Sequence, residues 1–103
     1  MKKVVIELDY KCFPLWIYEG EVISNDMIYE LKDDSYIENL LANIQKTYDS
    51  LFIDNEQEFA YKGFASLEDK LLFVNQIEAA VKYIKANITS AYDVVVSIDY
   101  DDL

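Results

Sequence analysis

The side chains that offer the most chemistry in this sequence are carboxylates, with 20 Asp and Glu among 103 residues. Glu56 and Glu58 would share one face of a strand, at about the separation of the paired acids in glycosidases. Two groups of acids are spaced to offer oxygen ligands to a divalent cation: Asp54, Glu56 and Glu58, and Asp99, Asp101 and Asp102. Neither has the calcium-loop pattern, and close pairs arise by chance in so acidic a chain. We therefore expect solvated surface carboxylates, no metal and no other cofactor.

The sequence lacks the residue types that most other catalytic mechanisms require. The sequence has no His and no Arg, which excludes Ser-His-Asp and Cys-His catalysis, imidazole ligands and a guanidinium phosphate clamp. The single cysteine, Cys12, cannot form an internal disulfide, and we expect it to be buried or half-buried. The neighbouring Lys11 would lower the pKa of this thiol only if it were exposed. We therefore predict a protein that is not an enzyme.

The net charge narrows the range of partners. Lysines number 9 against 20 acids, which gives a formal charge of −11 and a pI of about 4.2. Residues 19–58 hold eleven of the acids and two of the lysines, a net charge of −9. Such a chain repels nucleic-acid phosphates and anionic membranes, so we expect no direct nucleic acid and no membrane partner. The partner that this charge favours is a basic protein.

Tyrosine is the second unusual feature, with 9 residues, several of them interleaved with the acids of residues 19–58. Tyr is favoured at protein interfaces because it combines a large contact area with a polar tip. An acidic surface speeds association, whereas a few buried rings provide lasting affinity. The predicted partner-binding residues are eight acids and three tyrosine anchors: Asp26, Tyr29, Glu30, Asp33, Asp34, Tyr48, Asp49, Asp54, Glu56, Glu58 and Tyr61.

The elements that must position these residues begin with strands at both ends. Apolar residues alternate with polar ones from Val4 to Tyr10 and from Tyr92 to Tyr100, which predicts two strands of one sheet, each with a buried face. Between them, residues 13–18 and 21–24 are expected to form a hairpin that turns at residues 19–20.

Two helices are predicted from caps and apolar stripes. One follows Asp33-Asp34-Ser35, with a stripe of Tyr36, Leu40, Leu41, Ile44 and Tyr48; the other follows Ser66, with a stripe of Leu67, Leu71, Val74, Ile77, Val81, Ile84 and Ile88. Residues 49–63 between them are either two short strands or an aromatic loop. The expected fold is a single α+β domain over residues 1–103, in which a small, mainly antiparallel sheet packs against two helices.

The first residues of the sequence help to predict the cellular compartment of the protein. Met1-Lys2-Lys3 is similar to the start of a signal peptide, but acids interrupt the apolar run after Ile6, and a signal needs about 7–15 apolar residues there. A small domain with one cysteine also lacks the disulfides that secreted domains of this size use. We therefore expect a cytoplasmic protein.

Residues 8–18, 48–55 and 58–64 (LDYKCFPLWIY, YDSLFIDN and EFAYKGF) resemble those of small acidic immunity-type proteins. These are encoded beside the polymorphic toxins of Gram-positive bacteria, and the resemblance covers residues 6–75. It implies a cytoplasmic protein that occludes one cognate toxin and has no enzyme activity, and it carries over no binding residues. Two alternatives stay open: a phage inhibitor that mimics nucleic acid to block a nuclease, of the anti-CRISPR or anti-restriction type, and, less favoured, a small carboxylate- or metal-dependent enzyme.

Overall fold

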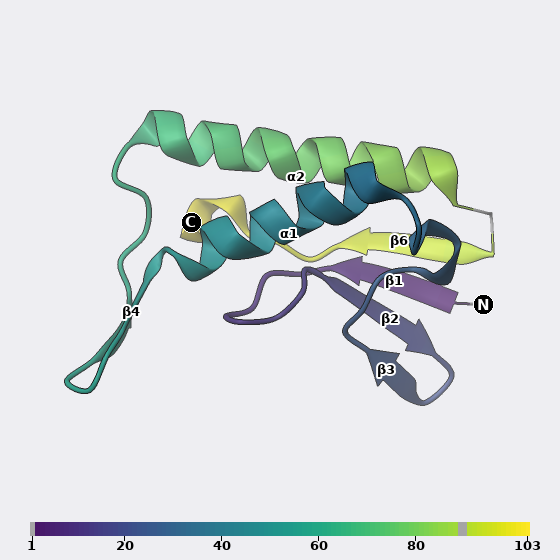
Figure 1. Cartoon of the computed structure of the whole chain (residues 1–103), viewed down its shortest axis with the longest axis horizontal. Helices are drawn as coiled ribbons and strands as arrows, with labels where there is room; N and C mark the ends of the chain where they lie inside the picture. Colours follow the sequence, from purple (N-terminus) through teal and green to yellow (C-terminus); the bar gives the residue numbers. More distant parts are fainter. Residues whose placement is uncertain (1, 89–90) are drawn as a thin grey trace.

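The computed structural model describes residues 2–88 and 91–103. A sheet forms one layer and two α-helices cover one of its faces, while a separate hairpin projects from one end (Figure 1). In chain order the described elements are β1 (Lys2–Ile6), β2 (Leu15–Glu19), β3 (Val22–Ser24), the 3₁₀ helix η1 (Tyr29–Leu31), α1 (Ser35–Asp49), β4 (Phe52–Asp54), β5 (Phe59–Tyr61), α2 (Leu67–Asn87), β6 (Tyr92–Val96) and the 3₁₀ helix η2 (Tyr100–Asp102). The expected α+β class is confirmed.

The larger sheet has the strand order β3-β2-β1-β6. As expected, the two terminal strands lie in one sheet and a hairpin extends it, with Gly20 at a φ of 62° in the turn. The strands are shorter than predicted: β1 ends at Ile6 rather than Tyr10, β6 ends at Val96 rather than Tyr100, and β2 begins at Leu15 rather than at residue 13. The pairings β1–β2 and β2–β3 are antiparallel, but β1 and β6 are parallel. A parallel neighbour requires a long crossover connection, and here the chain between β1 and β6 includes both helices.

The inner face of the sheet carries the predicted alternation. Val4 and Ile6 of β1 and Leu15 of β2 are buried in the core beneath the helices. Val5 points to the opposite face and is nonetheless buried, because Trp16 and Val95 lie directly beside it on the neighbouring strands. The alternation therefore predicts the helix-facing side correctly and misses a partly apolar outer side.

Helix α1 begins at its predicted cap. The Asp34 side chain accepts hydrogen bonds from the backbone N–H groups of Tyr36 and Ile37, which no residue within the helix can satisfy. The buried stripe is Ile37, Leu41 and Ile44. Tyr36, expected in that stripe, is 55% exposed, so the stripe begins one residue later than predicted.

Helix α2 also begins as predicted, with the Ser66 side chain accepting from the backbone N–H of Asp69. Its buried residues are Phe73, Ile77, Ala80 and Ile84. The stripe was predicted to start earlier, but Leu67 and Leu71 are exposed. The first turns of α2 extend past the end of the sheet (Figure 1), so the sheet does not cover them.

A side-chain contact joins the two helices at the other end. The Tyr83 hydroxyl of α2 donates a hydrogen bond to the Asp34 carboxylate that caps α1, and the Tyr83 ring lies 4.8 Å from that of Tyr36. The hydrogen bond from Tyr83 lowers the pKa of Asp34, and the same bond raises the pKa of Tyr83. One carboxylate thus serves both the helix cap and the packing of the helices.

Tyr83→Phe should reduce stability in a pH-dependent way. Because the folded-state pKa of Asp34 is lowered, its contribution is present above the unfolded pKa, about 3.9, and is lost as the pH falls through the folded value. Urea unfolding should therefore show the largest difference from wild type at neutral pH and a smaller one at pH 3. A difference independent of pH would contradict the assignment.

Two alanine variants of α2, Ile77→Ala and Leu71→Ala, distinguish the observed buried stripe from the predicted one. Both residues belong to the predicted stripe, but only Ile77 belongs to the observed one. Ile77 is fully buried, so its truncation should lower the free energy of unfolding by about 2–5 kcal/mol. Leu71 is 53% exposed, and its truncation should change it by no more than about 0.5 kcal/mol. Equal losses in chemical denaturation would show that the first turns of α2 pack as the sequence predicted.

Candidate partner-binding site

Helix α1 divides the predicted binding residues into two groups. Asp34 caps one end and Asp49 is the last residue at the other, and 15 helical residues span about 22 Å. The eleven residues therefore do not form one face. We call the residues before α1 the cap group: Asp26, Tyr29, Glu30, Asp33 and Asp34. We call those from the end of α1 onward the hairpin group: Tyr48, Asp49, Asp54, Glu56, Glu58 and Tyr61.

Carboxylates of the cap group mostly serve the fold. Besides Asp34, Asp26 accepts from the backbone N–H of Met27 at 2.7 Å, and Glu30 accepts from the Tyr92 hydroxyl at 3.2 Å. Burial and this bond to Glu30 raise the pKa of Tyr92 to about 12. Tyr29 is 75% exposed, and Lys32 Nζ lies 5.2 Å from the centroid of its ring.

The hairpin group surrounds the second, two-stranded sheet, which settles the open interpretation of residues 49–63 in favour of strands. In this sheet Phe52 pairs with Tyr61 and Asp54 with Phe59. The Asn55 side chain stabilises the turn between the two strands, because its Oδ1 accepts hydrogen bonds from the backbone N–H groups of residues 57 and 58. Glu56 and Glu58 precede β5 and lie in this turn, so the expected strand with two acids on one face is wrong.

A cluster of five rings fixes the hairpin to the rest of the molecule. Phe52 is its centre: its ring centroid lies 4.6 Å from that of Tyr10, 5.2 Å from Tyr48, 5.6 Å from Phe59 and 5.1 Å from Tyr61. Tyr48 belongs to α1 and Tyr10 to the loop between β1 and β2. The hairpin is therefore held from two sides.

Polar contacts reinforce this attachment. The Tyr10 hydroxyl donates to Asp54 Oδ2 at 2.9 Å, and the backbone N–H of Lys11 donates to Asp49 Oδ1 at 2.8 Å. Lys11 has a φ of 60°, a left-handed conformation that is uncommon outside glycine, and its Nζ lies 3.7 Å from Asp54 Oδ2. Asp49 and Asp54 are thus partly used in positioning the loop.

Five exposed side chains at the hairpin form what we call the hairpin patch, of which Asp54 also holds the loop through Tyr10 and Lys11: Asp54, Glu56, Glu58, Phe59 and Tyr61. Phe59 is 60% exposed and Tyr61 is 39% exposed. Burial raises the pKa of Tyr61, so its phenol stays neutral and able to donate a hydrogen bond. Phe59 was not among the predicted binding residues, although strand alternation places it on the same face as Tyr61.

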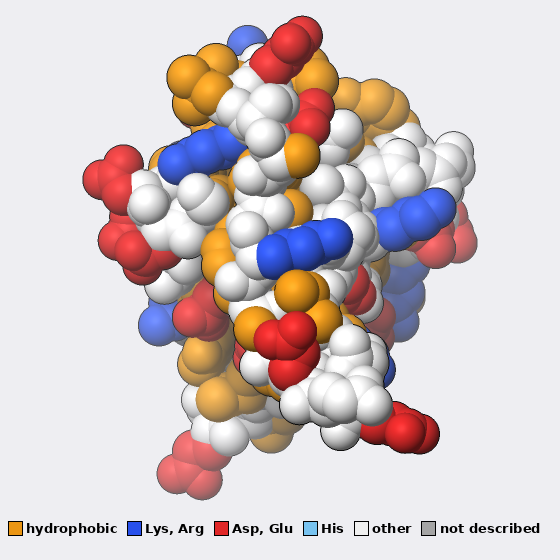
Figure 2. Space-filling model, turned by 90° about the vertical axis from the view of Figure 1, so that its left-hand side faces the viewer, with side chains coloured by type: hydrophobic (Ala, Val, Ile, Leu, Met, Phe, Trp, Pro, Cys, Tyr) orange, Lys and Arg blue, Asp and Glu red, His pale blue; other side chains and the backbone are white. Residues whose placement is uncertain are grey.

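The end of the molecule that carries the hairpin has mixed charge. Figure 2 shows this end face-on: many carboxylates lie around its edge and some lie nearer the middle, where lysine side chains cross it with hydrophobic side chains between them. The acids therefore do not merge into one continuous surface at this end.

Cys12 and the acidic side chains are groups that could bind a metal or act as a nucleophile. Cys12 is half-buried, and burial, followed by the charges of Asp9 and Asp49, raises the pKa of its thiol. Within residues 2–88 and 91–103, no three His, Cys, Asp or Glu side chains are placed to hold a metal ion.

Phe52→Ala should loosen the hairpin. The variant loses all four ring contacts, and we expect the free energy of unfolding to fall by about 2–3 kcal/mol, with faster proteolysis within residues 52–61. The control is Tyr29→Ala, which removes an exposed ring at the other end and should change stability by no more than about 0.5 kcal/mol. Unchanged protection of the hairpin would show that the ring cluster does not hold it.

No curated protein matches this chain. No helix in the part of the chain that the structure describes has the length and apolar character needed to cross a membrane. One family model, described as Serratia CdiI immunity protein-like, matches residues 2–99. The match extends beyond residues 6–75 of the expected resemblance, and its description names Serratia, so it gives no support to the expected Gram-positive source. Because the match spans nearly the whole chain, the protein belongs to the Serratia CdiI immunity protein-like family.

Proposed function

We propose that this protein is a stoichiometric, non-catalytic inhibitor that binds a cognate bacterial toxin in the cytoplasm through the hairpin patch. Membership of an immunity protein family supports the toxin as partner. The observation that carries the choice of surface is the exposure of two aromatic rings on a rigidly held hairpin, with three carboxylates beside them.

The rings are suited to act as anchors because they are already ordered. Phe59 stacks on Phe52 at an interplanar angle of 13°, and its centroid lies 5.2 Å from that of Tyr10, yet 60% of its surface is exposed. A partner that covers this ring gains apolar burial without the entropic cost of fixing a mobile side chain. Interface energy is concentrated in a few such aromatic residues.

The carboxylates of the hairpin patch supply attraction at a distance. Glu56 and Glu58 are exposed in the turn, and neither forms an ion pair within the described residues. Exposed ion pairs contribute only about 0–1 kcal/mol each, so these acids would act on the association rate with a basic toxin surface. Affinity would come from the rings.

The cap group is less suited to this role because three of its carboxylates accept hydrogen bonds that hold the fold together. A partner that drew Asp34 or Glu30 into new contacts would compete with those bonds. Tyr29, the tyrosine of that group, is 75% exposed, and within residues 2–88 and 91–103 no other ring packs against it.

The affinities of two variants, Phe59→Ala and Tyr29→Ala, show whether the hairpin patch or the cap group binds the toxin. Titration calorimetry should use the C-terminal domain of a large toxin encoded beside this gene. If the hairpin patch binds, Phe59→Ala weakens binding about 30-fold or more, because a central aromatic anchor is worth about 2 kcal/mol or more. Tyr29→Ala then changes the affinity less than about threefold.

Thermal unfolding of each free variant separates lost contact from lost fold. The opposite pattern, with Tyr29→Ala the damaging change, would move the binding surface to the cap group. A wild-type chain that neither binds nor protects cells from that toxin would overturn the proposed function.

A further inference from the structure

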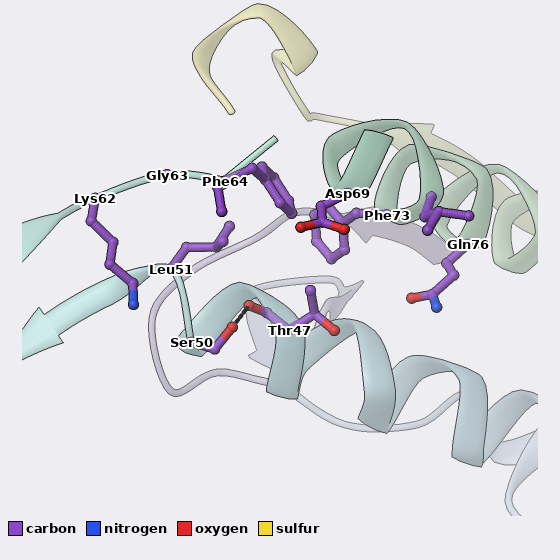
Figure 3. A pocket seen from close by; sticks show the side chains of 11 residues that line it. Thr47, Ser50, Leu51, Lys62, Gly63, Phe64, Asp69, Phe73 and Gln76 are labelled. Carbon is purple, nitrogen blue, oxygen red and sulfur yellow. Dashed lines mark hydrogen bonds between the residues drawn. The ribbon is translucent and has the colours of Figure 1, made fainter. Parts of the chain in front are cut away.

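A groove of about 520 Å³ opens beside the base of the hairpin. Three segments line it: the last turn of α1 with Thr47 and Ser50, the chain that leaves β5 from Lys62 to Ala65, and the first turns of α2. Figure 3 shows Lys62 at the hairpin end and Gln76 at the opposite end, with Asp69 between them. The groove and the hairpin patch thus occupy the same end of the molecule.

Gln76 is the unusual residue of this groove. Its Oε1 atom is buried and has no hydrogen-bond partner within the described residues. A buried acceptor without a donor lowers stability, because it has lost water and gained nothing in return. In Figure 3 the Gln76 amide lies between the two helices, facing the Thr47 side of the groove.

The local electrostatics favour a cationic donor. Asp69 lies two helical turns before Gln76 on the same side of α2, and its carboxylate forms no ion pair within the described residues. Thr47 and Ser50 are at the C-terminal end of α1, where the helix dipole is negative. The lysine that lines the groove, Lys62, stands at the hairpin end, away from Gln76.

We propose that this groove receives a lysine or arginine side chain of the cognate toxin. Its charged head would lie between the Asp69 carboxylate and Gln76, whose amide must turn toward the groove for the buried Oε1 to accept a hydrogen bond from it. Its aliphatic stem would lie along Phe64 and Leu72, the latter 58% exposed. The inference rests on the proposed function, because the occupant belongs to the toxin that the hairpin patch binds. The groove adds a specific polar contact to the aromatic anchors.

Gln76→Met tests the role of the amide with two readouts of opposite sign. Met has a similar shape and removes the unpartnered acceptor, so the melting temperature of the free protein should rise by about 4 °C or more. Affinity for the toxin domain should fall about 10- to 100-fold, because a hydrogen bond to a charged group is lost. A merely structural glutamine would not combine a more stable protein with a weaker complex.

Asp69→Asn tests the charge of the occupant. We expect about tenfold weaker binding, whereas the control Glu68→Gln removes the same charge from the same helical turn outside the groove and should leave the affinity unchanged. Alanine replacement of each toxin Lys and Arg should then identify one residue whose loss weakens binding to wild type and has little further effect on binding to Gln76→Met.

The outcomes separate this inference from the proposed function. Toxin binding by the wild type with equal affinity for Gln76→Met overturns the groove contact and leaves the inhibitor role standing. Weaker binding by Gln76→Met with no effect of Asp69→Asn overturns the cationic occupant. Absence of any binding by the wild type overturns the proposed function itself.

Discussion

The structure depends on the apolar seam where α1 and α2 pack against each other and against the sheet. Ile37, Leu41 and Ile44 of α1 belong to the same buried cluster as Ile77 and Ile84 of α2. Because α1 spans the length of this seam, the loops and polar side chains that flank the helix lie at its two ends, about 22 Å apart. The cap group lies at one end, and the hairpin and groove lie at the other. The distance between the predicted binding residues therefore follows from core packing.

The hairpin end shows how a small surface is made rigid without a large core. A two-stranded sheet is only marginally stable alone in water, and β4–β5 has three residues in each strand. Contacts of Phe52 with rings from α1 and from the loop after β1 supply what the strands lack. The outer rings, Phe59 and Tyr61, extend the same cluster into solvent. In the proposed mode of binding, one group of aromatic side chains would therefore provide both the stability of the hairpin and the recognition of the toxin.

Local signals in the sequence predicted local structure well. The caps at Asp34 and Ser66 start both helices, and the period-two alternation identifies both terminal strands. The failures are of a different kind. Leu71 repeats at a helical spacing but is exposed, and the eleven candidate residues share a composition but not a location. Burial and proximity depend on how the layers overlap, which the spacing of residues along one element does not encode. The sequence does not mark Gln76 as unusual, because whether a side-chain atom finds a hydrogen-bond partner depends on the residues packed around it.

Net charge and contact chemistry therefore act at different scales in this molecule. A charge of −11 produces a long-range field whichever face the acids occupy, so it can attract a basic partner without a continuous acidic surface. Several acids are meanwhile used inside the fold: Asp34 caps α1, Asp99 caps η2, and Asp49 holds the loop before β2. The hairpin patch adds exposed rings and acids at one end of the molecule. Since Phe59 and Tyr61 pack on the ring cluster, the proposed partner would not have to order them on binding.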